Sequence, residues 1–306
     1  MINSIPFKPY GASSKSNVLI VGSDGMIGAA LKSHLILKGY QALGTTRRPG
    51  LVASNSIFID LQDPKTLNNL SEEHFDTAVL CGAVTSLKTC EENPDYAQAI
   101  NVDGTIALAK ILAKAGTHLI FISTNMVFDG GKSNYCVSDI KIPANQYGMQ
   151  KSTVEDWLLS AIPTAAIIRF GKVLPRELSL FTQWQEELLA NKKISPYYGK
   201  TMAPISLDLA IKILTWMVDT KKPGIFQATA SSDITYVDAA LFLAHYCNAS
   251  PDLIEPVIAP PLTDSDVQES HQFLFSTLQF SSDFAHICTA PSPIDALYYS
   301  MPQARS

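Results

Sequence analysis

The sequence predicts an α/β protein built on a doubly wound parallel sheet. In the first half of the chain, short apolar segments alternate with helical patterns, and the connections between them are short. Such an order implies right-handed crossovers and therefore parallel strands. The first apolar segment, 18–21, also leads into three glycines at three-residue steps and then into a helical pattern. Ligands of such folds bind at the carboxyl ends of the strands, so we expect the functional site there.

The glycine-rich turn at 22–28 is the strongest local signal. A strand that turns tightly into a helix directs the helix's backbone N–H groups, and the positive end of its dipole, toward a phosphate. Gly22 permits the turn, Gly25 lets the backbone approach a pyrophosphate, and Gly28 lets helix and strand pack closely. The spacing is G-x-x-G-x-x-G and not the commoner G-x-G-x-x-G, and glycines in a strand–helix turn can also have a purely structural role. The residues of this turn that we expect to bind a dinucleotide are Gly22, Asp24, Gly25, Met26, Ile27 and Gly28.

The end of the second predicted strand, 41–44, indicates which dinucleotide is bound. The strand is followed by two threonines and then by Arg47 and Arg48, at the place where a dinucleotide fold meets the adenosine ribose. An acidic residue there would bind a free 2′-hydroxyl, whereas arginines can pair bidentately with a 2′-phosphate. The arginines therefore favour NADPH over NADH. A solvated pair of loop charges is the other interpretation.

Small or polar residues follow the next two strands. Asp60 and Leu61 come after the predicted strand 57–59, where such an Asp often lies beside the adenine or equally caps a helix. Cys81, Gly82 and Ala83 come after the predicted strand at 77–80. Small residues there let the ribose and diphosphate of a cofactor lie close to the backbone. We expect all five residues to contact the cofactor.

Tyr147 and Lys151 form a Y-x-x-x-K pair in a predicted helix that follows Pro143. Positions four apart share one helical face, so both side chains can project into one site. A nearby ammonium lowers the pKa of a tyrosine from its ordinary value near 10, which makes Tyr147 a usable proton donor or acceptor. Lys151 can also hold the nicotinamide ribose. Thr124, which follows Ser123 at the end of the predicted strand at 118–122, can hydrogen-bond a substrate carbonyl.

Composition and charge limit the class of protein. The chain has 306 residues, of which 46% are hydrophobic and 17% charged, which allows a sizeable core. The formal net charge is -5 and the basic residues are scattered, so neither nucleic acid nor a membrane surface is expected as a partner. Five cysteines without a C-x-x-C spacing indicate reduced thiols in a cytoplasmic protein. No stretch approaches the roughly 20 apolar residues of a membrane span, and the histidines lack metal-ligand spacing.

The predicted organisation has three parts. Residues 1–16 are expected to be an N-terminal tail, because they lack the apolar run of a signal peptide. Residues 17–172 are expected to form the dinucleotide-binding domain, with a long helix at 97–115 and a last strand at 165–170. Beyond residue 172 the pattern loosens, and the prolines of the last fifty residues indicate loops. The elements still predicted there are helices at 180–190, 205–218 and 236–246 and a strand at 224–228.

Together these residues resemble the extended short-chain dehydrogenase/reductase family. The matches are the glycine turn, the Asn-Val-Asp-Gly-Thr helix at 101–105, the Ser-Thr strand end and the Tyr/Lys pair. Within the family, Ser-Thr-Asn-Met-Val-Phe-Asp-Gly at 123–130 is similar to Ser-Thr-Asp-Tyr-Val-Phe-Asp-Gly of the dTDP-4-dehydrorhamnose reductase branch. Pro-Ala-Asn-Gln-Tyr-Gly at 143–148 is similar to its Pro-x-Asn-x-Tyr-Gly. The resemblance implies a Rossmann domain and a smaller carboxy-terminal substrate-binding region, 173–306, with segments that return to the Rossmann sheet.

That branch reduces the 4-keto group of a nucleotide-linked deoxysugar with NADPH. The resemblance therefore implies an NADPH-dependent reductase of a keto group on a nucleotide-linked sugar. Carried over by position, Thr124 would polarise the carbonyl and Tyr147 would donate the proton. Lys151 would lower the pKa of the tyrosine and bind ribose, and Asn101 would help order the helix or a water near the lysine. Members of the superfamily often dimerise through helices, so a homodimer is compatible with the resemblance.

Departures from the branch leave the substrate open. Asn125 and Met126 replace its Asp-Tyr, and the segment 81–90 lacks its Asn-Ala-Ala start. Asn125-Met126 also cannot supply the acid and base of a sugar 4,6-dehydratase. Two alternatives stay open. One is a non-catalytic NADP-binding regulatory subunit, since the beta subunit of methionine adenosyltransferase looks like this branch. The other is a nucleotide-sugar epimerase, although epimerases usually hold NAD and Arg47-Arg48 argues against that.

Overall fold

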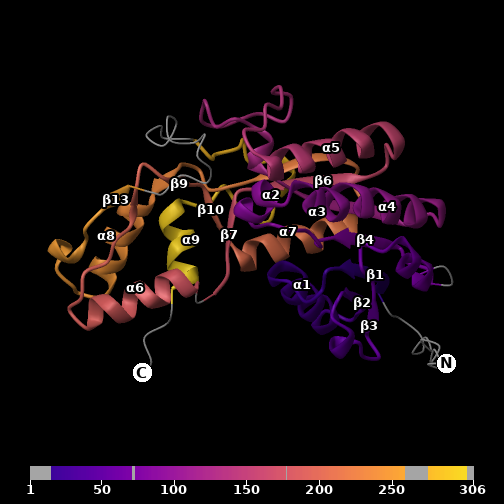
Figure 1. Cartoon of the computed structure of the whole chain (residues 1–306), viewed down its shortest axis with the longest axis horizontal. Coiled ribbons are helices and arrows are strands. Elements are labelled where there is room, and N and C mark those ends of the chain that lie inside the picture. Colours follow the sequence, from indigo (N-terminus) through magenta and orange to yellow (C-terminus); the bar gives the residue numbers. More distant parts are fainter. Residues whose placement is uncertain (1–14, 71–72, 177, 259–274, 302–306) are drawn as a thin grey trace. The chain divides into compact units, whose positions relative to one another are not determined.

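The computed structural model describes residues 15–70, 73–176, 178–258 and 275–301, and Figure 1 shows the chain with its elements labelled. The chain divides into two units. Unit 1 holds the described residues up to Ser123 together with Gln150–Ile168 and Ile211–Ile225. Unit 2 holds Thr124–Met149, Arg169–Ala210 and the described residues from Phe226 onward. Of the predicted tail, residues 1–14 lie outside the described residues, and Lys15 already begins the first strand.

The central element is a seven-stranded sheet with the strand order β11-β6-β5-β4-β1-β2-β3. Its strands are β1 (Lys15–Val21), β2 (Tyr40–Thr46), β3 (Ser56–Phe58), β4 (Thr77–Leu80), β5 (His118–Thr124), β6 (Ala166–Phe170) and β11 (Gly224–Ala228). β1 pairs in parallel with β2 and with β4, β2 with β3, and β4 with β5. The predicted doubly wound parallel sheet is confirmed. Its order reverses between β1 and β4, which is where such sheets bind ligands beyond the carboxyl ends.

The helices are interspersed with these strands along the chain. They are α1 (Met26–Leu37), α2 (Leu87–Glu92), α3 (Pro94–Gln98), α4 (Thr105–Lys114), α5 (Gln146–Ala161), α6 (Ser179–Leu189), α7 (Leu207–Thr220), α8 (Tyr236–Tyr246) and α9 (Pro293–Ser300). Three predicted elements coincide with the structure residue for residue: the strands β4 and β11 and the helix α8. β2 is longer than predicted, because Thr45 and Thr46 continue the strand and pair with Ile57 and Phe58 of β3.

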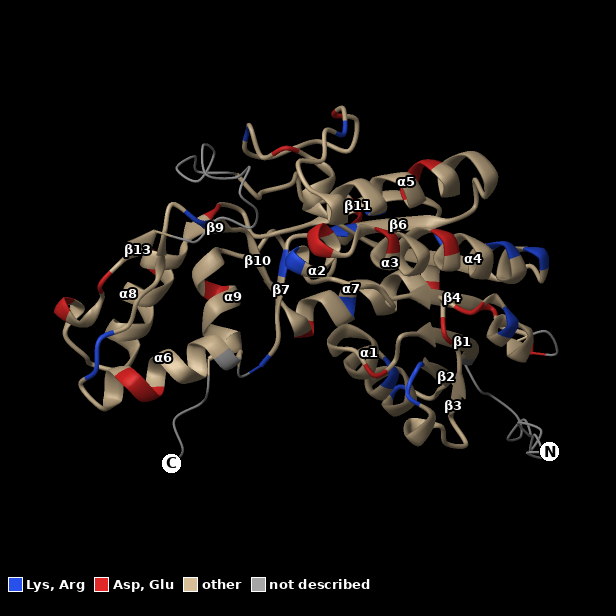
Figure 2. Ribbon diagram, in the orientation of Figure 1, with Lys and Arg blue, Asp and Glu red and all other residues tan. Residues whose placement is uncertain are grey.

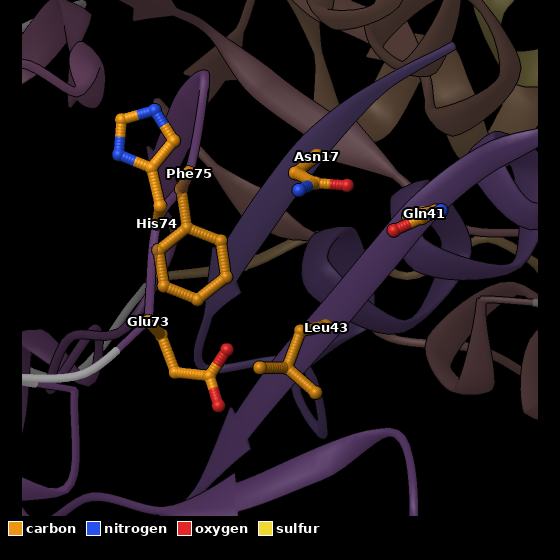
Figure 3. A pocket seen from close by; sticks show the side chains of 6 residues that line it. All are labelled: Asn17, Gln41, Leu43, Glu73, His74 and Phe75. Atoms are coloured by element: carbon orange, nitrogen blue, oxygen red, sulfur yellow. The ribbon is translucent and has the colours of Figure 1, made fainter. Parts of the chain in front are cut away.

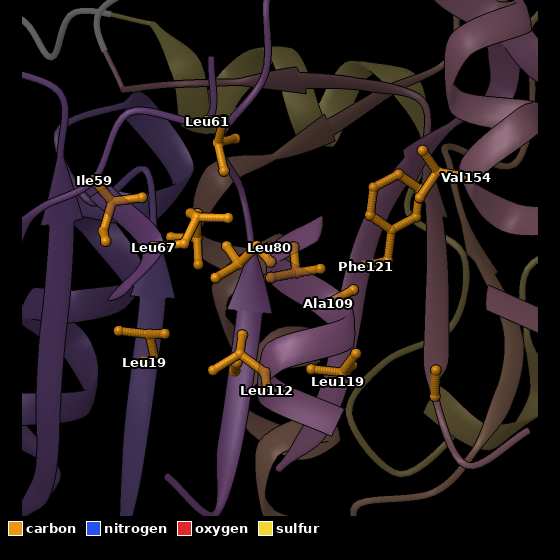
Figure 4. Packing of buried hydrophobic residues seen from close by; sticks show 14 of the residues in the cluster. Leu19, Ile59, Leu61, Leu67, Leu80, Ala109, Leu112, Leu119, Phe121 and Val154 are labelled. Carbon is orange, nitrogen blue, oxygen red and sulfur yellow. The ribbon is translucent and has the colours of Figure 1, made fainter. Parts of the chain in front are cut away.

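One face of the sheet in unit 1 carries a large apolar cluster. α4 and α5 pack their apolar sides onto the strands there, as Figure 4 shows. Its labelled members include Leu19, Leu80, Leu119 and Phe121 from strands, Ala109 and Leu112 from α4, and Val154 from α5. Full burial of each larger side chain of this kind contributes about 1.5–3 kcal/mol. This cluster fixes α5, the helix of the predicted Tyr/Lys pair, against β5.

The opposite face of the sheet is covered as well. Side chains alternate along a strand, so Val18 and Ile20 of β1 point away from the cluster that contains Leu19. Both are completely buried. α1, which contributes no residue to that cluster, contacts β1 and β2 and buries Leu31 and Leu35. The glycine-rich turn therefore connects a strand buried on both faces to the helix that covers one of them.

The prediction of one long regular helix at 97–115 is wrong, because a π-helical turn interrupts the α-helix. α3 ends at Gln98, a π-helical turn spans Ala99–Gly104, and α4 begins at Thr105. Within this turn the side chain of Asn101 points inward and is 1% exposed. A methyl group on Gly104 would lie 2.0 Å from the Leu61 carbonyl oxygen, so these two backbone segments approach closely. The π-helical turn accommodates both the inward amide and this close approach. The helical periodicity of the sequence does not indicate either feature.

Unit 2 is built from helices and very short strand pairs. β7 (Lys172–Leu174) pairs with β10 (Pro204–Ser206), β9 (Thr201–Met202) with β12 (Ile234–Thr235), and β8 (Tyr197–Tyr198) with β13 (Val257–Ile258). An apolar cluster joins α6, α8 and α9, with Phe181, Leu243 and Leu297 among its fully buried members. α9 was not predicted, because the last fifty residues were interpreted as loops. Its signals are nevertheless local: Ser292 caps it by accepting from Asp295 N, and Pro293 is its first residue.

Charged side chains are distributed along the whole ribbon. Figure 2 shows lysines and arginines interspersed with acidic residues in each unit. Along the described residues, no helix combines the length and the apolar character needed to cross a membrane. Over the same residues, no group of three or more His, Cys, Asp or Glu side chains could hold a metal ion.

Candidate functional site

The glycine-rich turn is tied to the end of β2. Gly22 has a φ of +76°, in the left-handed region that glycine tolerates best. Its N–H donates to Thr45 Oγ1 at 3.0 Å, and Ser23 N donates to the Thr45 carbonyl at 2.9 Å. A methyl group on Gly28 would lie 2.3 Å from the Gly22 carbonyl oxygen. The first turn of α1 is therefore held directly against the turn, and only glycine allows this distance.

The start of α1 has the properties of an anion site. Gly25 is the N-cap residue and has no side chain to satisfy the first N–H groups of the helix, which begins with Met26 and Ile27. No acidic residue lies in the first helical turn. The first backbone N–H groups of α1 and the positive end of its dipole thus point toward the turn, and neither a capping side chain nor an acidic residue of the first helical turn neutralises them. This is the arrangement that binds a diphosphate in dinucleotide folds.

The ends of β3 and β4 come close to this turn. A methyl group on Gly22 would lie 2.7 Å from the Gly82 Cα atom, and Cys81 N donates to the Val21 carbonyl at 3.0 Å. A methyl group on Gly82 would lie 3.6 Å from Leu61 Cδ1. Ala83 follows directly and is half-buried. Unit 1 therefore brings the predicted cofactor residues of β1, β3 and β4 together at one edge of the sheet.

Asp60 supports the turn that follows β3. Its carboxylate accepts a hydrogen bond from Gln62 N at 3.0 Å, and its own N–H donates to Thr66 Oγ1 at 3.0 Å. These contacts close the turn at 60–63 and do not cap the 3-10 helix Pro64–Leu70, because it is Asp63 Oδ1 that accepts from Lys65 N at 3.0 Å. The predicted helix-capping role of Asp60 is therefore wrong. Its role toward an adenine stays a prediction.

Both predicted arginines are engaged within unit 1. Arg47 Nη1 donates to the Tyr96 hydroxyl at 2.9 Å. This hydrogen bond raises the pKa of Arg47 above its usual range, and the nearby carboxylates of Asp60 and Asp24 add to the effect. Arg48 Nε lies 3.2 Å from Asp24 Oδ2. The structure thus gathers two cations at the end of β2, and Asp24 of the glycine-rich turn is the anion beside them.

Lys151 lies under the end of β5. Its Nζ donates to the Ile122 carbonyl at 2.8 Å and sits 4.6 Å from the centroid of the Phe121 ring. Only 4% of the residue is exposed. Burial lowers the pKa of Lys151 to about 8, against an opposing contribution from Cys81. Burial likewise raises the pKa of the Cys81 thiol to about 12. A lysine of this kind exchanges its proton close to neutral pH, which is unusual for an ammonium group.

Asn101 contacts the helix of Lys151 through the neighbouring residue Gln150. Its Oδ1 accepts from Val84 N at 2.7 Å, and its Nδ2 donates to the Val84 carbonyl at 2.9 Å and to Gln150 Oε1 at 2.7 Å. Gln150 is 2% exposed and immediately precedes Lys151 in α5. Asn101 therefore ties the π-helical turn to the segment after β4 and to the helix of the lysine. Gln150 was not predicted as a site residue, although its place beside Lys151 was a usable signal.

Thr124 and Tyr147 belong to unit 2. The Thr124 hydroxyl accepts from Met126 N at 3.2 Å and donates to Asn125 Oδ1 at 3.3 Å. A methyl group on Gly148 would lie 2.1 Å from the Met126 carbonyl oxygen, so the first turn of α5 packs against the turn that follows Thr124. Tyr147 adjoins Gly148 and lies four residues before Lys151 on the same helix. The structure thus brings the tyrosine's helical turn to the threonine.

Two polar groups next to Thr124 were not recognised as site residues in the sequence. Asn125 Nδ2 donates to the Ser276 carbonyl at 3.1 Å, and Ser276 N donates to Asp233 Oδ1 at 2.7 Å. Asn125 and Ser276 are 151 positions apart in the chain, so this contact joins distant segments next to the threonine's neighbour. The Ser123 hydroxyl is buried and has no hydrogen-bond partner among the described residues. No local pattern connects Asn125 with Ser276, so only the folded chain reveals this contact.

Two cavities of unit 1 lie at the other ends of the strands. The first, shown in Figure 3, is lined by side chains at the start of β1 and β2 and by 73–75. Its volume of about 20 Å³ is close to that of a single water position. The second, about 240 Å³, is lined in part by Thr117 and His118 at the start of β5. Neither coincides with the predicted site residues, whose roles toward a cofactor and a substrate stay predictions.

A family model matches most of the chain. The model described as the RmlD substrate binding domain matches residues 16–272. The chain is 26% identical over 276 residues to the methionine adenosyltransferase 2 subunit beta of Pongo abelii, and this covers 86% of the chain and 81% of that protein. It is 26% identical over 254 residues to a dTDP-4-dehydrorhamnose reductase of Mycobacterium tuberculosis, with 80% of each chain covered.

A solved structure supports the same relationship at the level of the fold. The dTDP-4-dehydrorhamnose reductase of Bacillus anthracis, determined in complex with NADP, superposes with a TM-score of 0.77 at 20% identity. The match covers 94% of this chain and 98% of that chain. This likeness is to the complete fold, including the region beyond the Rossmann sheet.

Proposed function

The chain belongs to the RmlD substrate binding domain family, and on this premise we propose that it is an NADPH-dependent reductase of a keto group on a nucleotide-linked sugar. The observation that carries the proposal is the buried Lys151 beneath the end of β5, one helical turn after Tyr147. A lysine whose pKa is lowered to about 8 is poised to exchange charge near neutral pH. The relatives named as dTDP-4-dehydrorhamnose reductases point to the same chemistry.

The residues of unit 1 fit a dinucleotide with a 2′-phosphate. The cap of α1 offers backbone N–H groups to a diphosphate, and Gly22 and Gly82 approach each other closely there without side chains of their own. Arg47 and Arg48 at the end of β2 would pair with the 2′-phosphate. Lys151 would hold the ribose next to the nicotinamide. When bound, the nicotinamide supplies the hydride that reduces the carbonyl carbon.

The proton side of the reaction is assigned to residues of this chain. The Tyr147 phenol gives its proton to the carbonyl oxygen as that oxygen gains charge, and the nearby ammonium of Lys151 stabilises the phenolate that remains. The Thr124 hydroxyl, held by a long hydrogen bond to Asn125, turns to donate to the same oxygen. Asn101 positions the helix of the lysine through Gln150.

The test is cofactor binding followed by turnover. We expect calorimetry to show tighter binding of NADPH than of NADH, and NADPH oxidation with at least one member of a panel of keto sugar nucleotides. Tyr147→Phe should abolish turnover while NADPH still binds. Tyr197→Phe, on the exposed strand β8, is the matched control and should keep activity. Failure to bind either dinucleotide would refute the proposal.

A second candidate is a non-catalytic NADP-binding regulatory subunit. The relative named as a methionine adenosyltransferase 2 subunit beta, which covers 86% of this chain, favours it. Tight NADPH binding without turnover on any panel substrate, together with co-purification of an unrelated enzyme, would support this candidate. Isomerisation of a sugar nucleotide without net NADPH oxidation would instead indicate an epimerase.

A further inference from the structure

The glycine-rich turn carries a carboxylate into the group that would hold a 2′-phosphate. Asp24 Oδ2 accepts a hydrogen bond from Thr46 Oγ1 at 3.1 Å and lies 3.2 Å from Arg48 Nε. Arg48 N donates to the same threonine hydroxyl at 3.1 Å. Asp24, Thr46 and Arg48 thus form one connected set at the end of β2. The carboxylate comes from the turn after β1 and not from β2 itself.

Because of these contacts, both arginine guanidinium groups already have a partner before any ligand binds. Arg47 is held by the Tyr96 hydroxyl, and Arg48 is paired with Asp24. The Asp24 side chain is 21% exposed and that of Arg48 66% exposed, so the pair stands at the surface where a ligand can reach it. A 2′-phosphate that binds Arg48 must displace or share this carboxylate, and the two anions repel each other. A free 2′-hydroxyl can instead donate to the carboxylate, as it does to acidic residues in NAD sites.

We propose that Asp24 is the specificity-determining residue of the dinucleotide site: it weakens the binding of a 2′-phosphate by occupying Arg48 and accepts a free 2′-hydroxyl. The chain therefore discriminates less strongly between NADPH and NADH than its two arginines alone indicate. This inference rests on the proposed function, because it concerns the cofactor of that same site.

The test compares two dinucleotides that differ only in the 2′-phosphate. The variant is Asp24→Asn, which removes the charge and keeps an oxygen that can accept from Thr46, so the turn retains its hydrogen bond. Glu92→Gln is the matched control, because it removes one carboxylate from another exposed ion pair of unit 1, Lys88–Glu92. Dissociation constants of NADPH and NADH are measured by calorimetry for each protein. Thermal unfolding verifies that each variant is folded.

We expect Asp24→Asn to raise the preference for NADPH over NADH by about threefold to fivefold, the scale of a partly exposed ion pair. Glu92→Gln should leave this ratio unchanged. An unchanged or lower ratio in Asp24→Asn would overturn the inference and leave the proposed function standing. Failure of the wild-type protein to bind either dinucleotide would overturn both.

Discussion

Replacement of Lys151 by methionine tests the buried ammonium through folding stability, independently of any substrate. Burial lowers the pKa of Lys151 from 10.5 to about 8 in the folded protein. Between these two values the unfolded chain holds more protons than the folded one, so the free energy of unfolding rises with pH. Below pH 8 the folded state bears the full cost of the buried charge, and this cost falls as pH rises through the folded pKa.

The size of the effect follows from the same two values. One proton contributes a slope of at most about 1.4 kcal/mol per pH unit. The Cys81 thiol, whose pKa burial raises to about 12 from 9.0, opposes this slope above pH 9. The useful window is therefore pH 7.5 to 9. Across it, we expect the wild-type protein to gain about 1 kcal/mol relative to Lys151→Met.

Urea unfolding at several pH values measures this difference. Lys88→Met is the matched control, because that lysine is 70% exposed in its side chain and pairs only with the exposed Glu92 among the contacts described. Its stability should follow the wild-type pH profile. Parallel profiles for wild-type protein and Lys151→Met would refute the reasoning, since they would mean that Lys151 stays charged throughout the window.

Substitutions at Gly28 and at Asn101 test two tightly packed positions of unit 1. Gly28→Ala places a methyl group 2.3 Å from the Gly22 carbonyl oxygen, and overpacking against backbone costs about 1–3 kcal/mol. Gly50→Ala meets nothing within 4 Å, so its thermal unfolding should match the wild type; equal melting temperatures for the two variants would contradict this. Asn101→Ala leaves the N–H and carbonyl of Val84 and the Gln150 amide without their buried partner, which costs about 2–4 kcal/mol in urea unfolding. Asn101→Asp keeps the acceptor for Val84 N but places a buried carboxylate against the Val84 carbonyl and Gln150 Oε1, so it should lose at least as much stability as Asn101→Ala, and a smaller loss would argue against this assignment.

The fold could be predicted because its signals are local. The glycine turn, the apolar strands and the cap of α1 each lie within about ten consecutive residues, and their periodicities are distinct. The location of the candidate site was also predictable, since parallel strands place their carboxyl ends at one edge of the sheet. Unit 2 was less predictable, because strands of two or three residues such as β8 and β9 are too short to show an alternating pattern.

The candidate site was predicted as a set of residues but not as a set of contacts. The pairing of Arg48 with Asp24 and of Asn101 with Gln150 joins positions 24 and 49 residues apart, respectively. Such contacts depend on the packing of neighbouring strands and helices, which a single sequence does not encode in any local pattern. Asp24 was therefore predicted only as a residue of the glycine-rich turn that binds the dinucleotide, and its ion pair with Arg48 was not predicted.

The π-helical turn at Ala99–Gly104 holds one residue more than an α-helical turn would. Each residue of an α-helix advances the side chains by about 100°, and the wider turn absorbs the extra residue, so α3 and α4 keep nearly the phase of one continuous helix. The loss of a single residue here would therefore leave Leu108 and Leu112 in the apolar cluster that they occupy. It would instead remove the irregular turn from which Asn101 points inward. The extra residue thus serves the inward amide, and the packing of α4 does not depend on it.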